Sequence, residues 1–370
     1  MKKSRGTPDF LLLFLTLGMV GFGIVMIFSA SFTVSYWEMG NRWFFTQRQL
    51  IWAMIGLIFM LIAMNIPFSF YKERFFLILL VGVGLLLLVF VPGLGQNRNG
   101  ASSWVGIGSF TIQPAEFAKL SLIIYLAALM SKKKELMKSL KRGLIPALTV
   151  VGIYFGLIIL QPDFGTGLIL LMTAGIMIFA GGISMKHMMY IIAIIIATIP
   201  IAVLTAGYRM ARITSYLHPW DDPWGTGYHL IQSLIALGNG GIFGTGFGKG
   251  IQKFFYLPYP QSDFIFSVMG EELGFIGITL FILFFLFILW RILVISLHST
   301  DSFGTLVGIG IFSVFAIQAF INIGGVTGTI PITGVPLPFI SAGGSSLIMS
   351  MTSIGLILSL SRENTKSTQS

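Results

Sequence analysis

Long uninterrupted apolar stretches recur along nearly the whole sequence and constrain the fold more than any other feature. A stretch of about 17–25 apolar residues can cross the hydrocarbon core of a membrane as a helix. A helix satisfies its own backbone hydrogen bonds, which a segment surrounded by lipid must do. Such stretches lie near residues 10–31, 48–66, 75–92, 115–131, 143–160, 164–185, 187–206, 264–290, 303–325 and 340–360. We therefore predict an all-α polytopic membrane protein with ten transmembrane helices, forming a single transmembrane domain over residues 1–370.

The composition supports this class and excludes others. Of the 370 residues, 55% are apolar and only 10% are charged, against roughly 25% charged in ordinary soluble domains. The chain has no cysteine, which excludes disulfides and thiolate metal sites. Its four histidines lack the spacing of zinc ligands. The first apolar stretch follows a basic start, as in a signal peptide, but it is long enough to span, so we interpret it as a retained helix.

The distribution of basic residues predicts the orientation. Ten spans put both termini on the same side of the membrane. If that side is the cytoplasm, most lysines and arginines lie in inward segments, six of them in the loop 131–142. The positive-inside rule therefore places both termini in the cytoplasm, with residues 361–370 as a short cytoplasmic tail. The net charge of +10 then reflects topology and an affinity for membrane lipids, and it implies no nucleic acid.

This topology sends a long loop, residues 207–263, outward between the seventh and eighth helices. A loop of this length in a compact protein is usually functional or carries structure of its own. Residues 228–248 are apolar and end in a run of glycines. We expect a short helix there, lying against or dipping into the membrane from outside, followed by irregular backbone.

Asp263 is an isolated carboxylate at the end of this loop. If the chain is helical from this point, one face carries small residues that would let another helix, or a long thin ligand, approach closely. That face comprises Asp263, Ser267, Gly270, Gly274 and Gly277. The aspartate could perform chemistry at the mouth of such a groove, or it could merely cap the helix.

Other charged residues lie within or beside apolar stretches. Glu116 and Lys119 are three residues apart, so they can pair on a helix. A charge near hydrocarbon is costly and suggests function, although a self-neutralising structural pair is the alternative. Asp163 lies between two closely spaced spans, where we expect it to cap the sixth helix. Glu271 and Glu272 are about 100° apart on a helix and cannot share one partner, so their roles stay open.

Arg98, Arg209 and Arg212 lie in segments that the topology sends outward. Arginine suits bidentate contacts with phosphate. Their position near Asp263 suggests an anionic head group carried on a lipid. The alternative is contact with ordinary phospholipid head groups.

Five sequence blocks together resemble one family, the SEDS proteins (shape, elongation, division and sporulation), which comprise the RodA, FtsW and SpoVE group. The blocks are QPAEFAKL at 113–120, QPDFGTG at 161–167, and longer matches at 212–248, 257–277 and 322–347. They occur in the family's order, and the wording is nearest to the FtsW/SpoVE branch. Two residues depart from the common pattern: Tyr259 stands where many members have glutamate, and Ala342 where many have a larger residue.

The resemblance implies a peptidoglycan glycosyltransferase of the bacterial cytoplasmic membrane, with its active site facing outside. Such enzymes polymerise lipid II into a growing glycan strand and work with a class B penicillin-binding protein. Asp263 occupies the family's essential aspartate position, so we expect it to act as general base, with polyprenyl pyrophosphate as the leaving group. The substrate-binding candidates are Gln113, Glu116, Lys119, Asp163, Ser262 and Ser345 together with Arg98, Arg209 and Arg212. We expect no nucleotide cofactor and leave open a divalent cation, Mg²⁺ or Mn²⁺, with no ligands assigned.

Two other functions remain open. A flippase for lipid-linked cell-wall precursors would use Asp263 and the Glu116–Lys119 pair to line a transport route, but it should carry charge near the middle of the membrane. A non-catalytic scaffold would leave Asp263 dispensable. The sequence does not distinguish a role in division, elongation (cell shape) or sporulation.

Overall fold

The computed structural model describes residues 6–98, 101–107, 110–132, 140–190, 193 and 207–367, and most of them are helical. The helices are α1 (Phe10–Met39), α2 (Phe44–Asn65), α3 (Phe68–Glu73), α4 (Phe75–Leu88), α5 (Pro114–Lys132), α6 (Ile145–Ile159), α7 (Phe164–Ala180), α9 (Gly207–Leu217), α10 (Tyr228–Gly240), α11 (Ile265–Leu297), α12 (Ser302–Val326) and α13 (Gly344–Ser367). A π-helical turn, η2 (Leu140–Leu144), precedes α6, and a 3₁₀ turn, η3 (Pro219–Asp221), follows α9. The predicted stretch 187–206 lies largely outside the described residues.

Six helices of the described part are long and apolar enough to cross a membrane: α1, α2, α5, α11, α12 and α13. Three shorter apolar helices, α4, α6 and α7, coincide with further predicted stretches. These helices make the chain a multi-pass membrane protein. Each forms because a run of apolar residues cannot leave its backbone groups unpaired in lipid.

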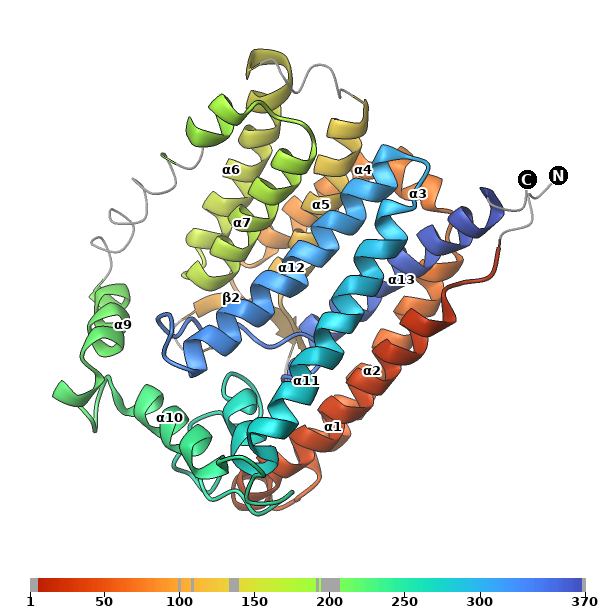
Figure 1. Cartoon of the computed structure of the whole chain (residues 1–370). Coiled ribbons are helices and arrows are strands. Elements are labelled where there is room, and N and C mark those ends of the chain that lie inside the picture. Colours follow the sequence, from red (N-terminus) through yellow and green to blue (C-terminus); the bar gives the residue numbers. More distant parts are fainter. Residues whose placement is uncertain are drawn as a thin grey trace.

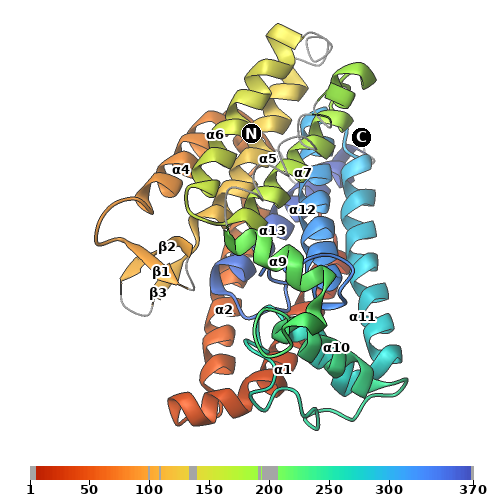
Figure 2. The ribbon, with the colours of Figure 1, turned by 90° about the vertical axis from the view of Figure 1, so that its left-hand side faces the viewer.

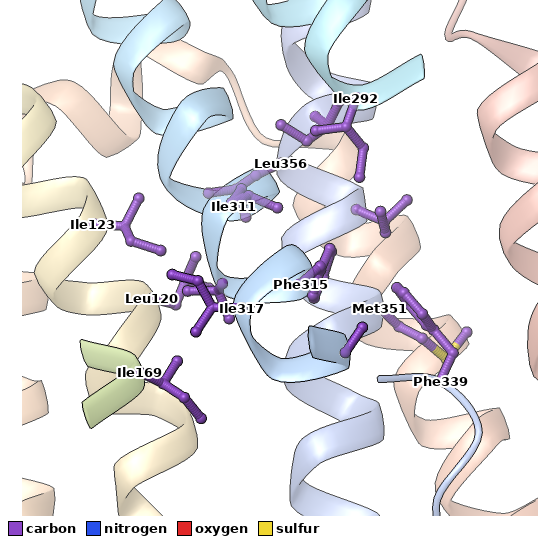
Figure 3. Close-up of a cluster of buried hydrophobic side chains, with 14 of the residues drawn as sticks. Leu120, Ile123, Ile169, Ile292, Ile311, Phe315, Ile317, Phe339, Met351 and Leu356 are labelled. Atoms are coloured by element: carbon purple, nitrogen blue, oxygen red, sulfur yellow. The ribbon is translucent and has the colours of Figure 1, made fainter. Parts of the chain in front are cut away.

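The centre of the bundle is apolar and closely packed. Figure 3 shows side chains of α5, α7, α12 and α13 converging, among them Leu120, Ile169, Phe315 and Met351. Helices α5 and α12 are buried over most of their surface, whereas α1, α2 and α11 expose many apolar side chains. A helix that is apolar all round is suited either to a core or to contact with lipid, so these exposed faces are the ones that lipid would cover.

The two chain ends meet at one end of the bundle (Figure 1). The backbone amide of Gly6 donates to the carbonyl of Arg362 at 3.1 Å, and the amide of Asp9 donates to Ser361 Oγ at 3.0 Å. Asp9 also caps α1, by accepting from the amide of Leu12, and pairs with Arg291 of α11. The start of α1 and the end of α13 therefore lie at the same end of the bundle.

A small antiparallel sheet joins α4 to α5, which the prediction of an all-helical chain did not include. Its strands are β1 (Gly95–Arg98), β2 (Ala101–Ile107) and β3 (Phe110–Ile112), in that order. Figure 2 shows the sheet beside the helices, and α9 and α10 at the end of the bundle away from the termini. The sheet, α9 and α10 all lie in connections that the predicted topology sends outward.

The helix α10 and the irregular backbone after it, residues 241–264, confirm the fold expected for the segment 228–248. Residues 241–244 of this irregular backbone pack into a break in α11. Gly274 has φ 68°, and a Cβ there would lie 2.2 Å from the backbone nitrogen of Gly244. The amide of Phe275 donates to the carbonyl of Gly241 at 2.9 Å instead of continuing the helix. Only glycine permits so close an approach with this φ value.

The predicted continuous small-residue face from Asp263 to Gly277 is therefore wrong. The helix begins only at Ile265, and the break at Gly274 interrupts the periodicity. The small residues are covered by α10: Ser267 Oγ lies 2.7 Å from Ser233 Oγ, and a Cβ on Gly270 would meet Leu237. Of the two partners considered for this face, a helix or a long thin ligand, it is a helix that occupies it.

Candidate active site

Asp263 lies two residues before α11, in a half-buried position. The N-cap of the helix is Phe264, so Asp263 does not cap it. Asn322 of α12 donates through Nδ2 to the Asp263 carbonyl at 3.0 Å and to the Val335 carbonyl at 2.8 Å. One amide side chain thus fixes the Asp263 backbone to the segment that follows α12.

The surroundings of Asp263 favour its neutral form. Burial raises the pKa of the Asp263 carboxyl, and the hydrogen bond with Ser262 and the positive charge of Arg212 oppose this rise in part. Burial, and next the charge of Arg212, lower the pKa of His229 at the start of α10. A carboxylate whose pKa lies above its ordinary range is a better proton acceptor at neutral pH.

Arg212 reaches the same place from α9. Its Nη1 donates to the carbonyl of Thr333 at 3.2 Å. The adjacent Gly334 faces Asp263, because a Cβ on this glycine would lie 3.6 Å from Asp263 Oδ2. The first cluster of the site therefore joins α9, α10, the start of α11 and the segment after α12.

A second cluster joins three residues that the sequence analysis named separately. The amide of Gln113 donates to Ser345 Oγ at 3.0 Å, and Gln113 Nε2 donates to Asp163 Oδ2 at 3.0 Å. Asp163 Oδ1 accepts from the amide of Thr166 at 3.1 Å, so Asp163 caps α7 as predicted. The starts of α5, α7 and α13 are thus tied together.

The Glu116–Lys119 pair is confirmed one turn further along α5. Lys119 Nζ donates to Glu116 Oε1 at 2.9 Å, and each residue is only 5% exposed. Together with Gln318, Ser350 and Ser353 the pair lines a cavity of about 20 Å³. This space is sufficient for a single water molecule and not for a sugar.

The segment 327–343 connects the two clusters. Besides its contacts with Arg212 and Asp263, it holds the residues just before the aspartate: Ser341 Oγ donates to the Ser262 carbonyl at 2.7 Å. The amide of Ala342 donates to the Gln261 carbonyl at 2.8 Å. The segment then leads to Ser345 of the second cluster. It therefore fixes both clusters relative to each other.

A cavity of about 210 Å³, which the sequence analysis missed, lies between α2, β2, β3, residues 261–262 and residues 342–344. Its walls are Phe45, Arg48, Gln49, Trp52, Trp104, Thr111, Gln261, Ser262, Ala342, Gly343 and Gly344. Arg48, Gln49 and Trp52 come from α2 and Trp104 from β2, far from Asp263 in the sequence. The signal that could have found them is an arginine and two tryptophans at or near the predicted outward ends of spans.

Two predicted site residues lie on described backbone but carry side chains outside the described part of the chain: Arg98 at the end of β1 and Arg209 in α9. No group of three or more histidine, aspartate or glutamate side chains lies together within the described residues in a way that could hold a metal ion. A divalent cation there would depend mainly on oxygens that a substrate brings, as is common for Mg²⁺.

The fold and site define a class of protein: a helical multi-pass membrane protein with a half-buried carboxylate beside an arginine, and with a buried ion pair inside its helix bundle. The family model of the FtsW/RodA/SpoVE cell cycle proteins matches residues 10–366. The chain belongs to this family. Its FtsW/SpoVE branch is indicated by the relatives described next.

The similarity extends over nearly the full length of several relatives. Stage V sporulation protein E of Bacillus subtilis (strain 168) is 46% identical over 362 residues, covering 98% of this chain and 99% of the relative. A probable peptidoglycan glycosyltransferase FtsW of Geobacter sp. (strain M18) is 39% identical over 361 residues, covering 98% of both chains.

Solved structures show the same fold. A chain described under structural coordination of polymerization and crosslinking by a peptidoglycan synthase complex superposes with a TM-score of 0.80 at 28% identity, covering 96% of this chain and 98% of that one. The rod shape determining protein RodA of Thermus thermophilus gives a TM-score of 0.69 at 25% identity, covering 96% and 97%.

Proposed function

We propose that this protein is a peptidoglycan glycosyltransferase that polymerises lipid II into glycan strands. The observation that carries the proposal is Asp263, a carboxylate with a raised pKa beside Arg212, next to the wall of the 210 Å³ cavity. The relatives named as probable peptidoglycan glycosyltransferases support the reaction class.

The orientation that we propose is ten transmembrane helices within one domain, both termini in the cytoplasm, and the loop 207–263 outside the bacterial cytoplasmic membrane. The meeting of the chain ends at one end of the bundle supports it, as does the position of α9 and α10 at the other end (Figure 1). Asp263 then faces the side on which lipid II is consumed.

In the proposed reaction Asp263 is the general base. It takes the proton from a sugar hydroxyl of the acceptor while that oxygen attacks the anomeric carbon of the donor. The bond from this carbon to the pyrophosphate breaks, polyprenyl pyrophosphate leaves with the bonding electrons, and the anomeric configuration inverts. General-base assistance typically contributes about 10²–10⁴-fold in rate.

Arg212 is the described cation best placed to stabilise the leaving pyrophosphate, since its charge acts on Asp263. Lys119 is buried against Glu116, and its proposed role is to hold Glu116, one turn from Gln113, and thereby to support Gln113. Arg98 and Arg209 remain proposed phosphate ligands. A divalent cation, Mg²⁺ or Mn²⁺, bound to the pyrophosphate would add positive charge there.

The cavity suits the sugar part of the substrate. Trp52 and Trp104 offer flat apolar faces, and Arg48, Gln49 and Ser262 offer hydrogen-bonding groups. A few polar groups on a largely apolar wall are typical of small-molecule sites. The second cluster, with Gln113, Asp163 and Ser345, would support the cavity floor and contact the substrate at its edge.

The rival function, a precursor flippase, needs charge along an open route through the membrane. The candidates for that charge were Glu271 and Glu272. Both are buried, and their carboxylates bind the loop that follows α10. Glu272 pairs with Lys253 of this loop at 2.5 Å. These contacts support an enzyme over a transporter.

We propose a class B penicillin-binding protein as partner, in keeping with the synthase complex whose chain shares the fold.

The test is polymerisation of purified lipid II, with and without the partner, followed by electrophoresis of the glycan strands. We expect strands from the wild type and from Asp221→Asn, an exposed acid in the same loop, and none from folded Asp263→Ala or Asp263→Asn. Strands from the Asp263 variants at the wild-type rate would exclude Asp263 as the base. Absence of strands throughout would refute the function and favour the flippase.

A further inference from the structure

Lys253 is a fully buried lysine that the proposed reaction does not use. Its Nζ donates to Glu272 Oε1 at 2.5 Å and to Ser29 Oγ at 3.2 Å, and it lies 4.9 Å from the ring centroid of Phe32. Ser29 also donates to Glu272, at 2.6 Å to Oε2. The three side chains come from α1, the loop 241–264 and α11. We call them the α1–α11 clamp: Ser29, Lys253 and Glu272.

The side chain of the neighbouring Glu271 binds the backbone of the same loop. Its carboxylate accepts from the amide of Ile251 at 3.0 Å and from the amide of Gln252 at 3.1 Å. Glu272 Oε2 accepts in addition from the amide of Gly248 at 3.1 Å. Two adjacent carboxylates that point about 100° apart thus fasten one loop at several points, which answers the question that the sequence left open.

The geometry connects the clamp to Asp263. Asp263 follows Lys253 by ten residues and precedes Glu272 by nine, so the ion pair closes a ring of chain with Asp263 on the far side. Two bulky residues of this ring have a positive φ, Phe255 at 67° and Tyr259 at 47°. Such conformations are unfavourable for bulky residues and persist only where their surroundings hold them.

We propose that Lys253 and Glu272, bridged by Ser29, are positioning residues for Asp263. The clamp fixes the strained loop and the first turns of α11 to α1, and thereby holds the Asp263 carboxylate against Ser262 and Arg212. The catalytic part of this inference rests on the proposed function, whereas the positional part does not. Arg212 of α9 is the charged group that acts on Asp263 from a neighbouring element, and its charge acts in the same way on His229 of α10.

The decisive variant is the double substitution Lys253→Met with Glu272→Gln. Each single substitution leaves a buried charge unpaired and is strongly destabilising, whereas removing both charges is often close to neutral. The double variant therefore keeps the fold but lacks the ion pair. Lys249→Met, an exposed lysine of the same loop, is the matched control. Ser29→Ala weakens the clamp without removing a charge and serves if the double variant does not fold.

The first readout needs no turnover. The infrared band of the protonated Asp263 carboxyl, assigned by its loss in Asp263→Asn, is titrated in each protein. We expect the titration to move in the double variant and in Ser29→Ala, and to stay at the wild-type pH in Lys249→Met. An Asp263 that titrates as in the wild type in every clamp variant would overturn the proposal, even if the chain polymerises nothing.

The second readout is strand synthesis at a temperature below the unfolding of every variant. Misplacing a reacting group by about 1 Å can cost roughly 100-fold in rate, so we expect the double variant to lose about 10- to 100-fold in turnover. If turnover is at the wild-type value in every clamp variant whose unfolding temperature is also at the wild-type value, the pair has a merely structural role. Absence of strands in the wild type would refute the proposed function and leave the infrared result to judge the clamp.

Discussion

At the scale of single residues, the site places ionisable groups where burial makes their charged forms unfavourable. The carboxyl of Asp263 has a raised pKa because burial opposes its charged form, and Arg212 and Ser262 relieve only part of that cost. The same burial that makes the aspartate a stronger base therefore lowers the stability of the folded chain. Two measurements separate these effects.

The first concerns stability. The folded-state pKa of Asp263 lies above the unfolded value, so its charge costs stability once the pH rises through the folded pKa, and costs nothing below the unfolded pKa. Asp263→Asn is neutral at every pH. We expect it to unfold at a higher temperature than the wild type at neutral pH, with the difference disappearing in acid. Thermal unfolding in detergent over a pH series measures this, with Asp221→Asn as control. A wild type more stable than Asp263→Asn at neutral pH would contradict it.

The second concerns activity. In the proposed mechanism strand synthesis requires ionised Asp263, so the rate should fall as the pH drops through the raised pKa of this group. The charge of Arg212 holds that pKa down. Arg212→Gln should therefore move the acid limb of the pH–rate profile to higher pH, whereas Arg212→Lys, which keeps the charge, should move it less. An acid limb that stays in place in Arg212→Gln would show that another group sets it.

At the scale of helices and strands, the bundle is held by buried polar contacts between elements. The Glu116–Lys119 pair lies within α5, which packs against α4, α7 and α12. A buried ion pair contributes little net stability compared with apolar residues of similar size, but breaking one is costly. Its value lies in keeping the start of α5, with Gln113, in place.

A double-mutant cycle tests this. Glu116→Gln and Lys119→Met alone should each lower the free energy of unfolding by about 3–5 kcal/mol, because each leaves a buried charge without its partner. The combined variant should recover most of this loss. Denaturant unfolding in detergent gives the three values. Losses that simply add would mean that the two side chains are not coupled.

Hydropathy predicted the helices well because lipid restricts long spans to apolar residues, and α5, α6 and α12 begin and end near the predicted limits. Helices α1 and α13 continue beyond their predicted ends. The sheet of residues 95–112 was missed because its strands are short and show no alternating apolar pattern. The break at Gly274 was missed because its cause is a loop some thirty residues earlier. Lys253 and Glu272 are separated in the sequence, as are Trp104 and Ser262, and only the folded chain brings the members of each pair together.

At the scale of the whole molecule, the arrangement has two distinct ends. One end carries the start of α1 and the end of α13, and the other carries α9 and α10 (Figures 1 and 2). Asp263 belongs to the second end, because the charge of Arg212 of α9 acts on it. In the proposed orientation the first end faces the cytoplasm.

The absence of cysteine in the 370 residues makes this orientation easy to test. Single cysteines can be introduced at exposed positions of the two ends, as Glu73→Cys and Trp224→Cys; Trp224 is 87% exposed. In intact cells a thiol reagent that does not cross membranes should label Trp224→Cys alone. Both should react after the cells are opened. Labelling of Glu73→Cys in intact cells would reverse the orientation.

The packing of α2 against α13 also determines when the helix bundle can be fully assembled. Ser359 of α13 donates to the carbonyl of Ile66, 293 residues earlier, and Gly355 lies so close that a Cβ would be 2.5 Å from the Met60 carbonyl. During synthesis α2 leaves the ribosome long before α13 exists. The face of α2 that α13 covers must therefore wait in the membrane, in lipid or against a temporary neighbour, until α13 has been synthesised. A chain that stops before α13 leaves that face uncovered.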